Sequence, residues 1–117
     1  MKIRIIGAGA VGAACLTAIV QRRFARGVFV LDRNRSKVRG LVTDVQYGAV
    51  LSPGTDVRDG GHADLEGASV VMVTAGVNEK VGGATDRNDP SGRLRLLDTN
   101  VAVCLQRHRA SAPRSGA

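Results

Sequence analysis

Three glycines near the amino terminus have the spacing of a phosphate-binding loop. Gly7, Gly9 and Gly12 form the pattern G-x-G-x-x-G within KIRIIGAGAVGAA, and Ala10 and Val11 stand between the last two. In that pattern the first glycine permits a tight turn, the second lets the backbone approach a pyrophosphate, and the third lets a helix pack closely. The amino terminus of that helix would offer N–H groups and a partial positive charge to the phosphates. The alternative interpretation is a glycine-rich turn that serves packing.

An acidic residue, Asp32, follows the next apolar stretch, VFVL. At this position a carboxylate can accept hydrogen bonds from a ribose 2′-hydroxyl, and its charge repels a 2′-phosphate. The pattern therefore favours NAD over NADP, although the neighbouring Arg33 weakens that preference. A cap on the following helix is the alternative role for Asp32.

These residues need a strand before the glycines, a helix after them and a strand before Asp32, and hydrophobic periodicity predicts all three. We expect strands at 2–6, 28–31, 56–58 and 69–74, helices at 10–24, 34–47 and 93–106, and a loop or helical turn at 64–67. Asn34 or Ser36 is expected to cap the second helix. Alternating strands and helices predict an α/β fold, a Rossmann-type doubly wound parallel sheet that is incomplete, with about four strands ordered 3-2-1-4.

The strongest predicted strand, SVVMVT, ends at Thr74 and is followed by Ala75 and Gly76. Ligands bind at the carboxyl ends of the strands in doubly wound sheets, so these three residues are candidates to pass beside the adenosine half of the cofactor. A glycine that simply ends a strand is the alternative for Gly76. Residues 77–92 lose all periodicity and are expected to form a mobile loop, of a length that is often functional.

Four segments in this order resemble one known family: IRIIGAGAVGAA, VFVLDRN, DLEGASVVMVTAGVNEK and RLRLLDTN. Together they are similar to the amino-terminal part of the L-lactate/malate dehydrogenase family, and to its lactate branch in particular, over residues 1 to about 103. The resemblance implies NAD as cofactor. It also implies, for the intact family, hydride transfer between NAD and a 2-hydroxy acid such as lactate or malate.

The resemblance assigns roles to single residues. It places the pyrophosphate loop at Gly7, Gly9, Ala10, Val11 and Gly12, the ribose-binding acid at Asp32, and the loop beside adenine and ribose at Gly76. Asn100 matches an asparagine near cofactor and substrate, and Arg93 matches the catalytic arginine that polarises the substrate carbonyl. The loop before Arg93 departs from the family because Val81 replaces an expected proline and extra residues follow it. Arg87 is therefore a competing loop arginine, and a solvated helix-start residue is the alternative role for Arg93.

The last segment, CLQRHRASAPRSGA, does not resemble the family, so residues 104–117 are expected to be a disordered or frameshifted tail. The family's proton-exchanging histidine, its aspartate partner and the arginine that grips the substrate carboxylate match nothing in this chain. His62 and His108 are interpreted as surface residues. The resemblance thus implies the class of NAD-dependent 2-hydroxy acid dehydrogenases, with the catalytic half absent from this chain. Whether the chain is an enzyme stays open, and we expect it to be inactive by itself.

Composition restricts the remaining partners. The formal net charge is +7, but no aromatic residues interleave with the basic ones, so solvated surface is favoured over a nucleic-acid interface. No apolar run is long enough to cross a membrane, and a cytoplasmic location is expected. Cys15 and Cys104 are expected to be buried, reduced thiols, with no metal site. The resemblance implies a small 2-hydroxy or 2-oxo acid as partner in the intact family. We also expect association with further copies of the chain, through the exposed edge of the strand 69–74.

Two alternatives to a dehydrogenase fragment stay open. One is a non-catalytic module that binds a dinucleotide or a relative of full length. The other, weaker one is a basic protein associated with nucleic acid. Cofactor titration distinguishes the dehydrogenase fragment from the protein associated with nucleic acid, and an activity assay distinguishes it from the non-catalytic module.

Overall fold

The structure, a computed structural model, describes residues 1–49, 54–76 and 97–111. The chain divides into two compact units, Met1–Ala75 and Gly76–Ala117. The predicted loop at 77–92, with Arg87, and the predicted loop arginine Arg93 lie outside the described residues.

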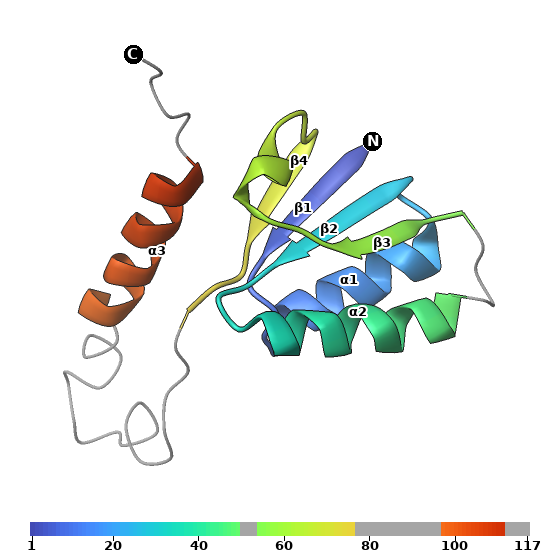
Figure 1. The fold of residues 1–117 in the computed structure, drawn as a ribbon, viewed down its shortest axis with the longest axis horizontal. Coiled ribbons are helices and arrows are strands. Elements are labelled where there is room, and N and C mark those ends of the chain that lie inside the picture. The colour runs from blue at the N-terminus through green and yellow to red at the C-terminus, as the bar shows by residue number, and fades with distance from the viewer. Residues whose placement is uncertain (50–53, 77–96, 112–117) are drawn as a thin grey trace, which may run out of the picture. The chain divides into compact units, whose positions relative to one another are not determined.

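The first unit is built on a parallel sheet of four strands in the order β3-β2-β1-β4 (Figure 1). This is the order expected from the alternation of strands and helices. The strands are β1 (Lys2–Ile6), β2 (Gly27–Leu31), β3 (Asp56–Asp59) and β4 (Val70–Val73). Because all four run in the same direction, the segments that follow β1, β2 and β4 meet at one edge of the sheet.

Two helices, α1 (Ala10–Arg22) and α2 (Arg35–Ala49), lie along the same face of this sheet (Figure 1). A short 3₁₀ helix, η1 (His62–Leu65), precedes β4. Asn34 caps α2, since its side-chain oxygen accepts a hydrogen bond of 3.1 Å from the Lys37 N–H. Arg23 is the C-cap of α1: it adopts a left-handed conformation with φ 54° and donates its N–H back to the last turn.

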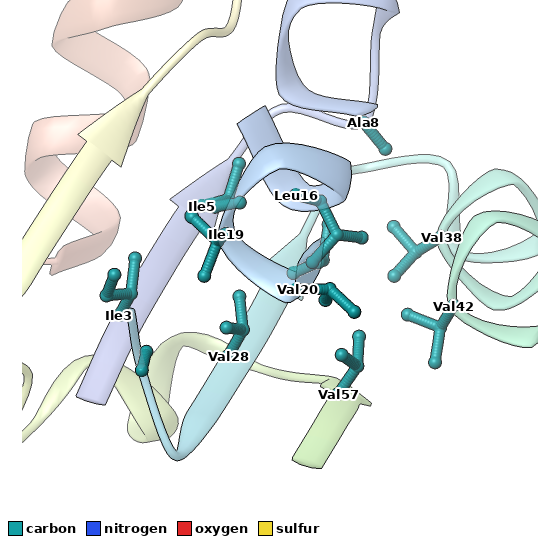
Figure 2. Close-up of a cluster of buried hydrophobic side chains, with 12 residues drawn as sticks. Ile3, Ile5, Ala8, Leu16, Ile19, Val20, Val28, Val38, Val42 and Val57 are labelled. Carbon is teal, nitrogen blue, oxygen red and sulfur yellow. The ribbon is translucent and has the colours of Figure 1, made fainter. Parts of the chain in front are cut away.

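The core fills the space between the sheet and the two helices (Figure 2). Alternate residues of the strands point toward the helices, as the two-residue period of a strand requires. Each large aliphatic side chain removed from water here contributes about 1.5–3 kcal/mol. The cluster comprises Ile3, Ile5, Ala8, Leu16, Ile19, Val20, Ala25, Val28, Val30, Val38, Val42 and Val57. Packing of Leu16 and Ile19 against Ile3 and Ile5 holds α1 close to the central strand.

A charged residue, Arg4, lies in the central strand and is 4% exposed. Its guanidinium stands 4.0 Å from the ring centre of Phe29, its neighbour on β2. It also donates hydrogen bonds to the backbone carbonyls of Asp64 and Ile3. The Arg4 side chain thus ties the turn η1 to the face of the sheet opposite α1 and α2.

The two edges of the described sheet have different chemistry. Asp56 and Arg58 on β3 form an exposed ion pair of 2.8 Å. On β4, by contrast, Val70, Val71 and Val73 are exposed, and Val73 retains 54% of its surface. A charged edge opposes pairing with another strand, whereas an uncharged apolar edge favours it.

The second unit contains helix α3 (Leu97–Ser111). Leu97, Val101 and Leu105 recur at the predicted helical spacing and are exposed. The helix extends past the end expected near residue 106, into the segment for which a disordered tail was expected. No glycine or proline occurs in LDTNVAVCLQRHRAS, so the sequence holds no residue that would stop the helix before Pro113. Residues 112–117 lie outside the described part of the chain.

Candidate dinucleotide site

The glycine loop follows β1 and leads directly into α1. Gly7 has φ +116°, a conformation that glycine adopts without strain, and its N–H donates a 2.8 Å hydrogen bond to the Leu31 carbonyl. A Cβ at Gly7 would stand 2.7 Å from the amide nitrogen of Ala75 and 2.9 Å from the Thr74 hydroxyl oxygen. Gly7 therefore makes the tight turn expected of it, in a space that admits no side chain.

Gly12 marks the place where α1 crosses this turn. A Cβ there would stand 2.0 Å from the Gly7 carbonyl oxygen and 2.8 Å from the Thr74 hydroxyl oxygen. Both distances are too short for any carbon atom at that position. The close packing of helix against strand that the sequence predicts for Gly12 is thus observed, and the neighbours that demand it are Gly7 and Thr74.

Gly9, Ala10 and Val11, which lie between these two glycines, face open space. A Cβ on Gly9 would meet no atom within 4 Å, and Val11 in the first turn is 63% exposed. Gly9 caps α1 without a side-chain hydrogen bond, and the first turn contains no acidic residue. The positive end of the helix dipole is consequently not neutralised by a side chain of the first turn. This geometry fits a pyrophosphate approaching Gly9, Ala10 and Val11.

Asp32 follows β2 and contacts the glycine loop. One carboxylate oxygen accepts a 2.8 Å hydrogen bond from the Ala8 N–H, and the other accepts a 3.0 Å hydrogen bond from the Asn34 N–H. The helix cap is Asn34, so the alternative role considered for Asp32 is taken by its neighbour. Ala8 was not among the predicted site residues, because an alanine side chain has no polar group and its contact with Asp32 is made by the backbone N–H.

Thr74 follows β4 and contacts the same loop from the other side of β1. Its N–H donates to the Ile6 carbonyl at 2.8 Å, continuing the pairing of the two strands. Its hydroxyl lies 3.0 Å from the Gly7 carbonyl oxygen and 3.4 Å from that of Ile6. Thr74, predicted as a neighbour of the cofactor, is therefore in direct contact with the loop backbone. Ala75 follows it, with its amide nitrogen against Gly7.

Two predicted site residues come together in the second unit. The side-chain oxygen of Asn100 on α3 lies 3.1 Å from where a Cβ on Gly76 would stand. A side chain at Gly76 would therefore displace Asn100. Their roles toward cofactor or substrate stay predictions, as does that of Arg93.

The cysteines differ from expectation. Cys15 is half-buried against the core, but Cys104 is exposed on α3. Within the described ranges, no three His, Cys, Asp or Glu side chains gather as a metal site requires. None of the helices described there combines the length and apolar character needed to cross a bilayer.

Comparison with known proteins agrees with this geometry. A family profile described as "lactate/malate dehydrogenase, NAD binding domain" matches residues 1–114, past the point near residue 103 where the resemblance was expected to end. The L-lactate dehydrogenase of Geotalea daltonii is 38% identical over 103 residues, 88% of this chain and 30% of that protein. That of Deinococcus radiodurans is 34% identical over 103 residues, 88% of this chain and 31% of that protein.

A solved structure shows the same fold. The minor L-lactate dehydrogenase from Enterococcus mundtii, in its ligands-bound form, matches with a TM-score of 0.81 and 28% identity, over 94% of this chain and 33% of that chain. Fold and loop together define a dinucleotide-binding domain of the Rossmann type. More particularly, the chain belongs to the NAD-binding domain family of the lactate/malate dehydrogenases, which confirms the predicted fold class and cofactor. It spans about a third of the length of these relatives.

The two kinds of glycine lead to opposite expectations for one added methyl group. Gly12→Ala should destabilise the domain by roughly 3 kcal/mol, because the methyl overlaps the Gly7 carbonyl and α1 must move. Gly9→Ala should cost about 1 kcal/mol or less, because its methyl enters open space, yet it should weaken NAD binding where the pyrophosphate approaches. Urea unfolding and calorimetric titration with NAD measure the two effects. Equal stability losses in the two variants would contradict this assignment.

Proposed function

We propose that this chain is the NAD-binding portion of an L-lactate dehydrogenase-like oxidoreductase. The observation that carries the proposal is the open amino terminus of α1 at Gly9, held in place by a loop that Asp32 and Thr74 both contact. The family match over residues 1–114 and the names of the relatives support it. When bound, NAD supplies the site that accepts or gives a hydride.

In this proposal the residues of the chain bind the cofactor and orient it toward the substrate. Gly9, Ala10 and Val11 present backbone N–H groups to the pyrophosphate, and Asp32 accepts hydrogen bonds from the ribose and repels a 2′-phosphate. The family resemblance assigns Asn100 a role toward cofactor and substrate, and it assigns Arg93, or Arg87 in its place, the role of polarising the carbonyl of a 2-oxo acid. The substrate class is a small 2-hydroxy acid such as lactate or malate. A cytoplasmic location and the absence of a nucleic-acid role remain predictions of the same proposal.

A non-catalytic dinucleotide-binding module is the second candidate. The surroundings of His62, whose side chain is the one histidine side chain described, favour this candidate. His62 is exposed in η1, and the carboxylate of Asp64 in the same turn accepts a 2.7 Å hydrogen bond from the Gly61 N–H. That pair offers no acid–base partnership of the kind hydride transfer to a carbonyl needs.

Cofactor selectivity provides the direct test. The chain should bind NAD about tenfold or more tightly than NADP, a difference of ~1.4 kcal/mol or more, because the Asp32 carboxylate repels the 2′-phosphate. Asp32→Asn removes the charge but keeps an oxygen for the Ala8 N–H, so it should bring the two affinities together. Asp32→Ala removes that acceptor as well and should also weaken NAD.

Calorimetric titration of each variant with both cofactors measures these affinities. Asp44→Asn, on the exposed surface of α2, is the matched control and should behave like the unaltered chain. Equal affinities of the unaltered chain for NAD and NADP would refute the selectivity assigned to Asp32.

We expect no oxidation of L-lactate or L-malate by the 117-residue chain, because its described residues place no histidine beside a carboxylate for proton transfer. The measurement is NADH absorbance over time, with an intact L-lactate dehydrogenase in the same assay as positive control. Activity that scales with the amount of chain and survives a second purification would favour the dehydrogenase over the non-catalytic module.

Association of the chain with copies of itself is proposed through β4. The exposed valines of this strand form an uncharged apolar edge, unlike the charged edge at β3. Sedimentation over a range of concentrations should show self-association, and Val71→Glu should reduce it by placing a charge at the edge. Tyr47→Glu, on exposed α2, adds the same charge elsewhere and should leave association unchanged. A monomer at every concentration would disprove the proposal.

A further inference from the structure

The peptide unit that joins Gly7 to Ala8 is bonded at both ends. Its carbonyl, from Gly7, accepts a 3.0 Å hydrogen bond from the Thr74 hydroxyl. Its N–H, from Ala8, donates a 2.8 Å hydrogen bond to the Asp32 carboxylate. A trans peptide is planar, and its C=O and N–H point in opposite directions. Thr74 and Asp32 therefore hold one rigid plane from two sides.

The two side chains come from the two strands that flank β1. Asp32 follows β2 and Thr74 follows β4, and both strands pair with β1 in parallel register. The Thr74 backbone is itself fixed by its N–H, which donates to the Ile6 carbonyl. Gly7 and Ala8 are buried, so rotation of their peptide plane would leave two polar groups without these partners in a place that water reaches poorly.

The orientation of this plane decides where the loop points. Gly7 has φ +116°, a region in which glycine moves easily between conformations. The next residue but one, Gly9, caps α1 at the open face where the pyrophosphate would approach. A turn of the Gly7–Ala8 plane would redirect Gly9 and the first N–H groups of α1. Without a restraint on the peptide plane, the conformational freedom of Gly7 would let the loop leave the geometry that a phosphate site requires.

We propose that Thr74 is a positioning residue for the phosphate-binding loop, whose hydroxyl locks the Gly7–Ala8 peptide opposite Asp32. The lock rests on the dinucleotide binding proposed above, and it assigns Thr74 a task other than contact with adenosine. Because the lock acts through the pyrophosphate loop, its loss weakens NAD and NADP by the same factor. Loss of the Asp32 charge, in contrast, changes the ratio between the two cofactors.

Three substitutions of Thr74 test the lock. Thr74→Val keeps the shape but replaces the hydroxyl with a methyl, which cannot donate and stands too close to the Gly7 carbonyl. Thr74→Ala removes the hydroxyl without adding bulk, and Thr74→Ser keeps it. We expect the valine and alanine variants to bind NAD about three- to tenfold more weakly, with the NAD to NADP ratio unchanged, and the serine variant to bind like the unaltered chain.

Hydrogen exchange of the Ala8 amide in the cofactor-free chain provides a second measurement. Exchange should accelerate in the valine and alanine variants and stay slow in the serine variant, because only the first two release the peptide plane. Thr55→Val is the matched control. Thr55 directly precedes β3, away from the loop, and its hydroxyl also donates a hydrogen bond to a backbone carbonyl, that of Ala25, at 2.9 Å. It should alter neither NAD affinity nor Ala8 exchange.

The outcomes separate the lock from the proposed function. If the unaltered chain fails to bind NAD, the proposed function falls, and Ala8 exchange still decides the lock. Unchanged Ala8 exchange and unchanged NAD affinity in Thr74→Ala would overturn the lock while leaving the function intact. Unfolding of both the valine and alanine variants, or weak binding by Thr74→Ser, would also overturn it, because the hydroxyl would then serve the stability of the whole domain or would not be the group that matters.

Discussion

The close approach of α1 to the end of β1 is the constraint on which the rest of the first unit depends. At the crossing, the Gly7 carbonyl oxygen lies 2.0 Å from where a Gly12 Cβ would stand. Only a residue without a side chain permits this contact, which lies where the amino terminus of α1 meets the carboxyl edge of the sheet. The aliphatic core below it, with Leu16 against Ile5, supplies the attraction that the two glycines make room for.

The same crossing explains why Asp32 and Thr74, two predicted site residues, have a structural role in holding the loop. A loop composed of small residues has no side chains of its own to hold it, so its backbone must be fixed by its neighbours. In a parallel sheet those neighbours are the residues that follow the two adjacent strands. Asp32, which is predicted to meet a ribose, is therefore also placed to meet the loop, and a substitution that removes its whole side chain cannot separate the predicted role from the observed one.

Local sequence patterns were sufficient for the strand order, the glycine loop and the position of Asp32, because each follows from spacing along the chain. The contact of Thr74 with Gly7 was not predictable in this way, since the two residues are far apart in sequence and meet only through the pairing of β1 with β4. Arg4 shows the same limit: alternation placed it in a strand, but its burial depends on Phe29 and on the turn at Asp64, which periodicity does not reveal.

The two edges of the described sheet differ in their capacity to pair with another strand. β3 bears the charged residues Asp56 and Arg58, and charges on an edge strand oppose pairing with a further strand. β4 reads VVMV, a continuous apolar run typical of parallel strands that are covered on both faces, yet three of its valines are exposed. Of the two edges of the described sheet, β4 is therefore the one whose chemistry permits pairing with another strand, and β3 is the one whose charges oppose it.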